Sequence, residues 1–125
     1  NDFWMYDPTT NTWTEKRKIN SSSDEDYDDD YSSYITRSNA GIFIMNNRAY
    51  LTTGYQSGVV NTTWQYDIAN DLWNEKTGFE GTAREGATGF TLNNRGYITT
   101  GTNSSSRFDD LWEFFPEAEQ SDSDN

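Results

Sequence analysis

The sequence predicts an all-β fold in which short antiparallel strands recur as a unit. A stretch of 18 residues occurs twice: residues 37–54 and 84–101 share an Arg, an Ala, a Phe, Asn-Asn-Arg, a Tyr and Thr-Thr-Gly at positions 47 residues apart. Aromatic residues make up 16% of the chain, which favours strands and a core of large rings. The apolar runs are too short for stable helices and are bounded by turn residues. A recurrence of this length indicates a repeat protein.

Each copy of the repeated stretch has the sequence pattern of a β-hairpin. Residues 40–45 form an apolar run, and residues 48–54 form a second run rich in strand-forming residues. Asn46 and Asn47 stand between them, and asparagine tolerates the positive φ that a tight hairpin turn requires. Because the first run is apolar at nearly every position, we expect it to be covered on both faces.

A second recurrence lies on either side of the hairpins. Trp-x-Tyr-Asp is followed by a turn, a second Trp and Glu-Lys. This pattern predicts two further strands, at residues 62–67 and 72–76, joined by a turn like the one at residues 7–11, where Pro fixes φ and Asp can cap the turn. The repeated aromatic residues are Trp4, Tyr6 and Trp13 in one copy and Trp64, Tyr66 and Trp73 in the other.

The resulting four-stranded antiparallel unit resembles the blade of a kelch-repeat β-propeller, including the kelch domains of bacterial exported proteins. Kelch blades usually end the second strand with Gly-Gly, whereas this chain has Thr-Gly. The resemblance covers all but an acidic insert and the tail, and implies part of a kelch propeller with about two and a half four-stranded blades. It rests on the Gly that ends the second strand, the Arg ahead of the first strand, and a Tyr and a Trp with six residues between them: Gly54 and Gly101, Arg37 and Arg84, Tyr6 with Trp13, and Tyr66 with Trp73.

The resemblance divides the chain into five parts. They are the third and fourth strands of a first blade (1–19), an acidic inserted loop (20–36), a complete second blade (37–79), a third blade without its fourth strand (80–116) and a flexible acidic tail (117–125). Nine strands cannot close a ring, since a propeller of four to eight blades needs about 16 to 32. We therefore expect the chain to be a fragment of a longer protein.

Composition excludes several kinds of partner. The 125 residues suffice for one domain, and 21 acidic against 9 basic residues give a net charge of −12. Such a charge repels the phosphates of nucleic acids and anionic lipid headgroups. We therefore expect no nucleic-acid partner and no membrane insertion.

Strand direction predicts where a binding surface lies. In the antiparallel unit, the longer connections at residues 55–60 and 102–108 and the acidic insert share one edge, and loops on a rigid scaffold commonly carry function. Arg37 and Arg84 enter their strands from that edge. Each can pair with a carboxylate such as Asp67 or with loop carbonyls, or can bind a ligand carboxylate. The candidate partner-binding residues are Tyr27, Tyr31, Arg37, Tyr55, Gln56, Arg84 and Arg107.

The acidic insert is a weak metal candidate. Six carboxylates fall between Asp24 and Asp30, a density that suits a hard cation such as Ca²⁺. No Gly lies between Asn20 and Ala40 to provide the sharp turn of an EF-hand loop. Tyr residues are interleaved with the charges, so we expect a partner-contacting loop that binds no metal tightly.

The repeated Trp and Tyr rings allow two interpretations. Their identical placement in each copy favours packing between neighbouring blades, so we expect Trp64, Tyr66 and Trp73 to be buried. The alternative is that they stack on carbohydrate. Some kelch-like propellers are copper oxidases that use His and Cys, and this chain has neither.

We expect a non-catalytic binding module without a cofactor. It serves protein–protein interaction, with a protein partner or a neighbouring subunit, in a larger extracellular or cell-surface protein. The alternative function is a carbohydrate-binding propeller.

Overall fold

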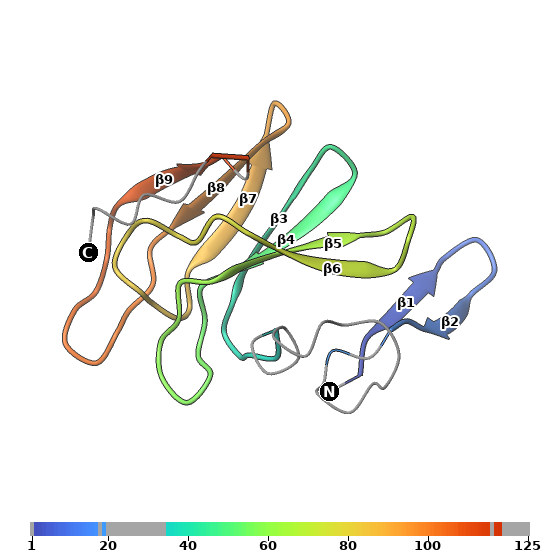
Figure 1. Ribbon diagram of the computed structural model, residues 1–125, viewed down its shortest axis with the longest axis horizontal. Helices are drawn as coiled ribbons and strands as arrows, with labels where there is room; N and C mark the ends of the chain where they lie inside the picture. The colour runs from blue at the N-terminus through green and yellow to red at the C-terminus, as the bar shows by residue number, and fades with distance from the viewer. Residues whose placement is uncertain (1, 18, 20–34, 116, 119–125) are drawn as a thin grey trace. The chain divides into compact units, whose positions relative to one another are not determined.

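The computed structural model describes residues 2–17, 19, 35–115 and 117–118 (Figure 1). These residues contain strands and no helix, so the predicted all-β fold is confirmed. Their nine strands form antiparallel sheets in the orders β1-β2, β3-β4-β5-β6 and β7-β8-β9. The strands are β1 (Trp4–Asp7), β2 (Thr12–Glu15), β3 (Gly41–Met45), β4 (Arg48–Thr52), β5 (Thr63–Asp67), β6 (Leu72–Lys76), β7 (Thr88–Leu92), β8 (Arg95–Thr99) and β9 (Leu111–Phe114).

The chain divides into two compact units, Asn1–Thr36 and Arg37–Asn125. The first unit contains the β1–β2 hairpin. The Asp7 carboxylate accepts a hydrogen bond from the Thr9 amide at 2.9 Å, as predicted for this turn. The aromatic residues of this hairpin are exposed, which differs from the expected packing, because a two-stranded sheet has no second layer of its own. They are Trp4, Tyr6 and Trp13.

The second unit contains the two repeated hairpins. Asn46 and Asn47 have φ values of 51° and 59°, and Asn93 and Asn94 have 51° and 58°. Two consecutive positive φ angles define the type I′ turn, which matches the twist of antiparallel strands. The predicted asparagine turns are therefore confirmed.

The second strand of each hairpin ends earlier than predicted, at Thr52 and Thr99. Thr53 and Gly54 have φ values of 58° and 104°, which are incompatible with a strand. A Cβ atom at Gly54 would lie 2.7 Å from the carbonyl oxygen of Ser38. The second position of the Thr-Gly pair therefore requires glycine, while threonine is accommodated at the first.

The sheets of the second unit pack together along β3 and β7, as Figure 1 shows. A Cβ atom at Gly89 would lie 2.2 Å from the carbonyl oxygen of Ile42, so glycine allows this close approach. Thr91 adds two hydrogen bonds: its hydroxyl accepts from the Ile44 amide at 2.9 Å and donates to the Ile44 carbonyl at 2.7 Å. The contact between the sheets is thus both close and polar.

Aromatic rings form the core between these sheets. Phe43 stacks on Tyr50 with ring centroids 5.2 Å apart, and Phe114 of the other sheet lies 5.4 Å from Phe43. A Cβ atom at Gly96 would lie 2.1 Å from the Phe43 ring, so this ring fills the space above the glycine. Trp64, Tyr66 and Trp73 lie on the other face of the four-stranded sheet, and the prediction that these rings are buried is confirmed.

β3 is covered on one face only. Phe43 and Met45 are buried, but Ile42 and Ile44 on the opposite face are exposed, so the expectation of cover on both faces is wrong. A similar face lies open on the third sheet. Phe90 stacks on Tyr97 with ring centroids 5.1 Å apart, and Phe90 is 39% exposed.

Candidate protein-binding surface

The loops of the second unit meet at one end of its two sheets. We call residues 37–40, 53–62, 84–87 and 100–110 the loop edge; they enter or connect the strands at the end away from the asparagine turns (Figure 1). Ser38 and Tyr55 exchange backbone hydrogen bonds of 3.0 and 2.8 Å. Glu85 and Thr102 exchange two of 2.9 Å. Each entering segment is thereby fixed to the loop beside it.

Further hydrogen bonds join the loop edge across the two sheets. The Gly54 amide donates to the Arg84 carbonyl at 2.8 Å, and the Gly86 amide donates to the Asn39 carbonyl at 2.8 Å. The Asn39 side-chain amide donates to the Glu85 carboxylate at 2.9 Å. Loops from both sheets therefore form one continuous surface.

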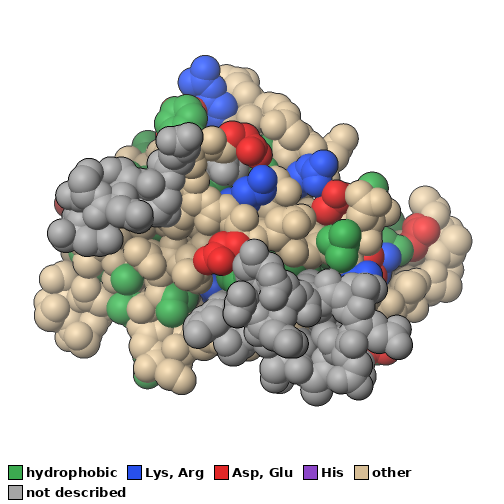
Figure 2. Space-filling view, viewed as in Figure 1, with side chains coloured by type: hydrophobic (Ala, Val, Ile, Leu, Met, Phe, Trp, Pro, Cys, Tyr) green, Lys and Arg blue, Asp and Glu red, His purple; other side chains and the backbone are tan. Residues whose placement is uncertain are grey.

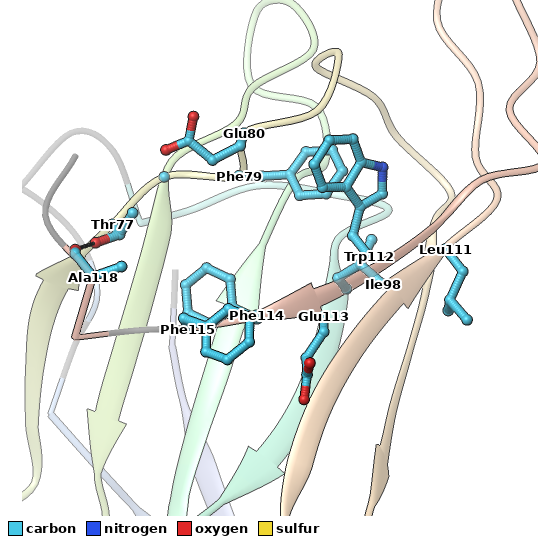
Figure 3. Close-up of a pocket in the computed structure, with 11 residues that line it drawn as sticks. Thr77, Phe79, Glu80, Ile98, Leu111, Trp112, Glu113, Phe114, Phe115 and Ala118 are labelled. Atoms are coloured by element: carbon cyan, nitrogen blue, oxygen red, sulfur yellow. Dashed lines mark hydrogen bonds between the residues drawn. The ribbon is translucent and has the colours of Figure 1, made fainter. Parts of the chain in front are cut away.

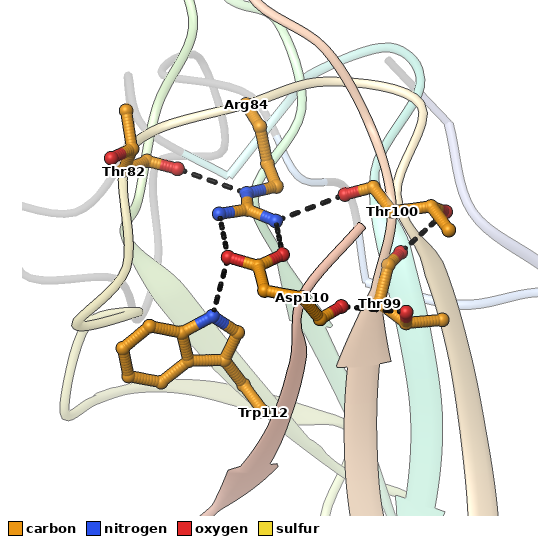
Figure 4. A network of polar contacts seen from close by, with 6 residues as sticks. All are labelled: Thr82, Arg84, Thr99, Thr100, Asp110 and Trp112. Atoms are coloured by element: carbon orange, nitrogen blue, oxygen red, sulfur yellow. Dashed lines mark hydrogen bonds and ion pairs between the residues drawn. The ribbon is translucent and has the colours of Figure 1, made fainter. Parts of the chain in front are cut away.

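Arg84 lies beneath this surface and is fully buried (Figure 4). Its guanidinium donates to the Thr82 and Thr100 carbonyls, each at 3.0 Å. Both terminal nitrogens also reach the carboxylate of Asp110, one of them at 2.9 Å. Because these donors are used inside the protein, the geometry favours the structural interpretation of Arg84 over direct ligand binding.

The positive charge of the buried Arg84 guanidinium is balanced by the carboxylate of Asp110. Hydrogen bonds from the Arg84 guanidinium lower the pKa of Asp110 to about 2, and Trp112 contributes a further donor at 2.9 Å. The Arg84 guanidinium lies over the ring of Phe108, 4.0 Å from its centroid, and 4.9 Å from the centroid of Phe79. The arginine is thus held by a carboxylate and two aromatic faces.

Arg37 has the same place in the preceding sheet, with different partners. It donates to the Thr53 carbonyl and to the Thr62 carbonyl at 2.9 Å each, and to the Thr62 hydroxyl at 2.8 Å. Burial lowers the pKa of Arg37 to about 10, opposed by the charge of Glu75. The suggested partner Asp67 lies at the other end of the sheet from Thr53 and Thr62, opposite Arg48, with which it pairs at 2.7 Å.

The exposed part of the loop edge includes three of the predicted residues. Tyr55 is 45% exposed, Gln56 is half-buried and Arg107 is exposed. Tyrosine and arginine are enriched at protein interfaces because each combines apolar area with hydrogen-bond donors. Tyr27 and Tyr31 lie outside the described residues.

The connection from β8 to β9 is an ordered turn. The Asn103 side chain accepts hydrogen bonds from the amides of Ser105 and Ser106 at 3.0 and 2.8 Å. The Thr102 hydroxyl donates to the Ser106 carbonyl at 2.8 Å. These bonds hold the following residue, Arg107, in a defined position.

The surface around the loops is mixed in character. On the face shown in Figure 2, hydrophobic side chains lie in small separate patches between acidic, basic and polar ones. Scattered apolar side chains are normal for a protein surface. Across the part of the chain that the structure describes, there is no helix with the length and hydrophobicity to cross a membrane.

No candidate metal centre is found among the described residues, since nowhere do three or more His, Cys, Asp or Glu side chains come together. The carboxylates from Asp24 to Asp30 lie outside the described residues. The start of the predicted tail is described: Glu117 pairs with Lys76 at 3.3 Å.

Two features of the structure were not predicted from the sequence. One is Asp110 as the partner of Arg84; the only local signal is that it directly precedes a strand. The other is a pocket of about 400 Å³ between β9 and the segment that follows β6 (Figure 3). Its walls come from Phe79, Trp112, Phe114 and neighbouring residues. The sequence signal for this pocket is the missing fourth strand.

Comparison with known proteins does not assign a family: no protein-family model matches the chain, and no curated protein matches it closely enough to count as a relative.

Proposed function

We propose that this chain is a non-catalytic protein-binding module that uses its loop edge to contact a partner protein. Its sheets are blades of a kelch-type β-propeller in a larger extracellular or cell-surface protein. The partner contacts Tyr55, Gln56 and Arg107, and the acidic insert with Tyr27 and Tyr31 extends the contact. Half-buried Arg37 and fully buried Arg84 hold the loops in place.

The observation that carries this proposal is the continuity of the loop edge. Backbone hydrogen bonds between Gly54 and Arg84, and between Gly86 and Asn39, hold loops from two sheets in one arrangement. A preorganised surface loses less conformational entropy on binding than separate flexible loops would lose. Repeated sheets that each contribute loops at the same end favour the propeller interpretation.

Carbohydrate binding is the second candidate. Exposed Tyr55 on the loop edge is the observation that favours it, because an aromatic ring can stack on a sugar. Trp64, Tyr66 and Trp73 are buried and so do not offer such a platform, while their exposed counterparts Trp4, Tyr6 and Trp13 belong to the β1–β2 hairpin and not to the loop edge. Protein binding therefore has the stronger support.

Affinity capture with matched variants tests the proposal. The chain is immobilised and exposed to extracellular extract of the source organism and, in parallel, to a glycan array. We expect a discrete protein to bind the original chain and the Ile68→Ala variant, whose side chain is exposed in the hairpin at the other end of β5. The double variant Tyr55→Ala/Arg107→Ala should lose this protein. Retention by the double variant, or binding of glycans alone, would contradict the proposal.

A further inference from the structure

β9 forms the outer side of a three-stranded sheet, and no described strand pairs with its free edge. Its counterpart in the four-stranded sheet is β5. Tyr66 of β5 pairs with Ala49, Phe114 of β9 pairs with Gly96, and Ala49 and Gly96 are at equivalent repeat positions, 47 residues apart. β5 carries β6 on its outer edge, with Tyr66 opposite Trp73. The third sheet therefore has a place for one more strand.

The free edge presents hydrogen-bonding groups of the main chain. The Thr100 amide donates to the Asp110 carbonyl at 3.4 Å, which marks a hydrogen-bonded pair at the start of β9. In an antiparallel ladder such pairs alternate, so the amide and carbonyl groups of Leu111 and Glu113 point away from β8. An edge of this kind is a template for an additional strand.

The pocket lies beside this edge, on the face of β9 that carries Trp112 and Phe114 (Figure 3). Phe79 and Trp112 meet edge-to-face with ring centroids 5.4 Å apart and form one wall. In the four-stranded sheet, Trp73 of β6 packs on Tyr66 of β5 with ring centroids 5.0 Å apart, and an added strand beside β9 would hold the position equivalent to β6. A residue opposite Phe114 on an added strand would project from the same face of the sheet and reach the pocket.

We propose that β9 binds an extended segment of a partner protein as a fourth antiparallel strand, with an aromatic side chain of that segment in the pocket. Main-chain hydrogen bonds supply affinity in this mode of recognition, and the pocket supplies specificity.

Charge indicates which residues flank the aromatic side chain. Glu80 and Glu113 line the pocket, and its described lining contains no Lys or Arg. Arg95, outside the lining, pairs with the Glu113 carboxylate at 3.5 Å, so Glu80 and the net charge of the chain carry the argument. The whole chain has a net charge of −12. The bound segment therefore carries Lys or Arg beside its aromatic residue. This surface is separate from the loop edge, so its test does not depend on the function proposed above.

A peptide that copies β6 provides the probe. It has the sequence of residues 69–78 with Asp71 and Glu75 replaced by lysine. Fluorescence anisotropy measures its binding to the 125-residue chain, and hydrogen exchange follows the amides of Leu111 and Glu113. We expect saturable binding, exchange at these amides slowed about tenfold or more, and affinity reduced about tenfold or more when the peptide Trp becomes Ala.

Paired variants separate strand addition from other contacts. Glu113→Pro removes an outward amide at an edge position that tolerates proline, and should weaken binding about tenfold or more. Glu113→Ala keeps the amide and should weaken binding about threefold or less. Circular dichroism checks the fold of both variants. If the proline variant does not fold, the peptide residue that corresponds to Asn74, which lies opposite Gln65 in the β5–β6 pair, is N-methylated instead. This change removes the second hydrogen bond of the same pair, from the peptide amide to the Glu113 carbonyl, and should also weaken binding about tenfold or more.

Three results would overturn the proposal. The first is no saturable binding at millimolar peptide. The second is affinity that neither proline substitution nor N-methylation changes. The third is slow exchange at Leu111 and Glu113 without peptide, because the edge of β9 would then already be covered.

Discussion

Arg84 and Asp110 form a two-point ion pair in which the arginine is fully buried and the carboxylate lies directly before β9. In the preceding sheet the arginine recurs as Arg37, while Thr62 directly precedes β5 in place of the aspartate. An ion pair therefore fixes the segment before β7 against the start of β9, whereas uncharged acceptors of Thr62 make the equivalent link to Arg37 in the preceding sheet. A buried arginine that loses its carboxylate becomes costly, which makes this pair a sensitive test of the loop edge.

Removing the charge of Asp110 should destabilise the protein. In Asp110→Asn, Arg84 keeps its carbonyl partners but loses a charged acceptor, and we expect the free energy of unfolding to fall by about 2 kcal/mol. Urea denaturation at neutral pH measures this change. Asp109→Asn is the control, since Asp109 is exposed, and should change the free energy by less than about 0.5 kcal/mol. Equal effects of the two substitutions would contradict the role of the pair.

The same pair predicts a pH dependence. The pKa of Asp110 falls from 3.8 to about 2 on folding, so its ionised form stabilises the native state. This contribution is fully present above pH 3.8 and is lost as the pH falls through about 2. The stability difference between the original chain and Asp110→Asn should thus be constant from pH 7 to about 4 and shrink below that. Urea denaturation across this range is the measurement, and a difference that vanishes near neutral pH would argue against the assignment.

The contact between the sheets depends on Gly89. In Gly89→Ala the added methyl group would meet the backbone of Ile42, which cannot move away as a side chain can. We expect a loss of about 1–3 kcal/mol in the free energy of unfolding. Thr88→Ala changes an exposed neighbour on the same strand and should have little effect. If thermal melting shows both variants to be equally stable, the sheets do not pack as closely as described.

Trp64 and Trp4 stand at matching positions of the repeat with opposite exposure. Trp64 is fully buried and Trp4 is 46% exposed. Trp64→Ala should lower the free energy of unfolding by about 3–5 kcal/mol, and Trp4→Ala by less than about 1 kcal/mol. Denaturant unfolding of both variants checks this. A small effect at Trp64, accompanied by weaker binding, would instead identify this ring as part of a binding surface.

The sequence predicts features that depend on local chemistry. Two consecutive asparagines require a hairpin turn, and alternating aromatic residues mark strands, so the nine strands follow from residues near one another in the chain. Three-dimensional neighbours are harder to predict. Asp110 is 26 residues from Arg84, and the corresponding position in the other copy is a threonine, so no repeat pattern reveals the pair.

Exposure also depends on what covers each sheet. Phe43 and Phe90 occupy the same repeat position and stack on equivalent tyrosines, but Phe43 is buried because Gly96 and Phe114 lie over it. Among the described residues, no further sheet covers Phe90. The pocket beside β9 likewise lies between β9 and the segment that follows β6, and the repeat pattern does not predict that these two segments are neighbours.

Site-specific photo-cross-linking tests most directly whether the loop edge is the protein-binding surface. A photoreactive amino acid replaces Tyr55 in one preparation and Ile68, in the hairpin at the other end of β5, in a second. Both preparations are irradiated in extracellular extract of the source organism. We predict a discrete cross-linked protein from position 55 and none from position 68. Cross-linking from position 68 alone, or equally from both positions, would contradict binding at the loop edge.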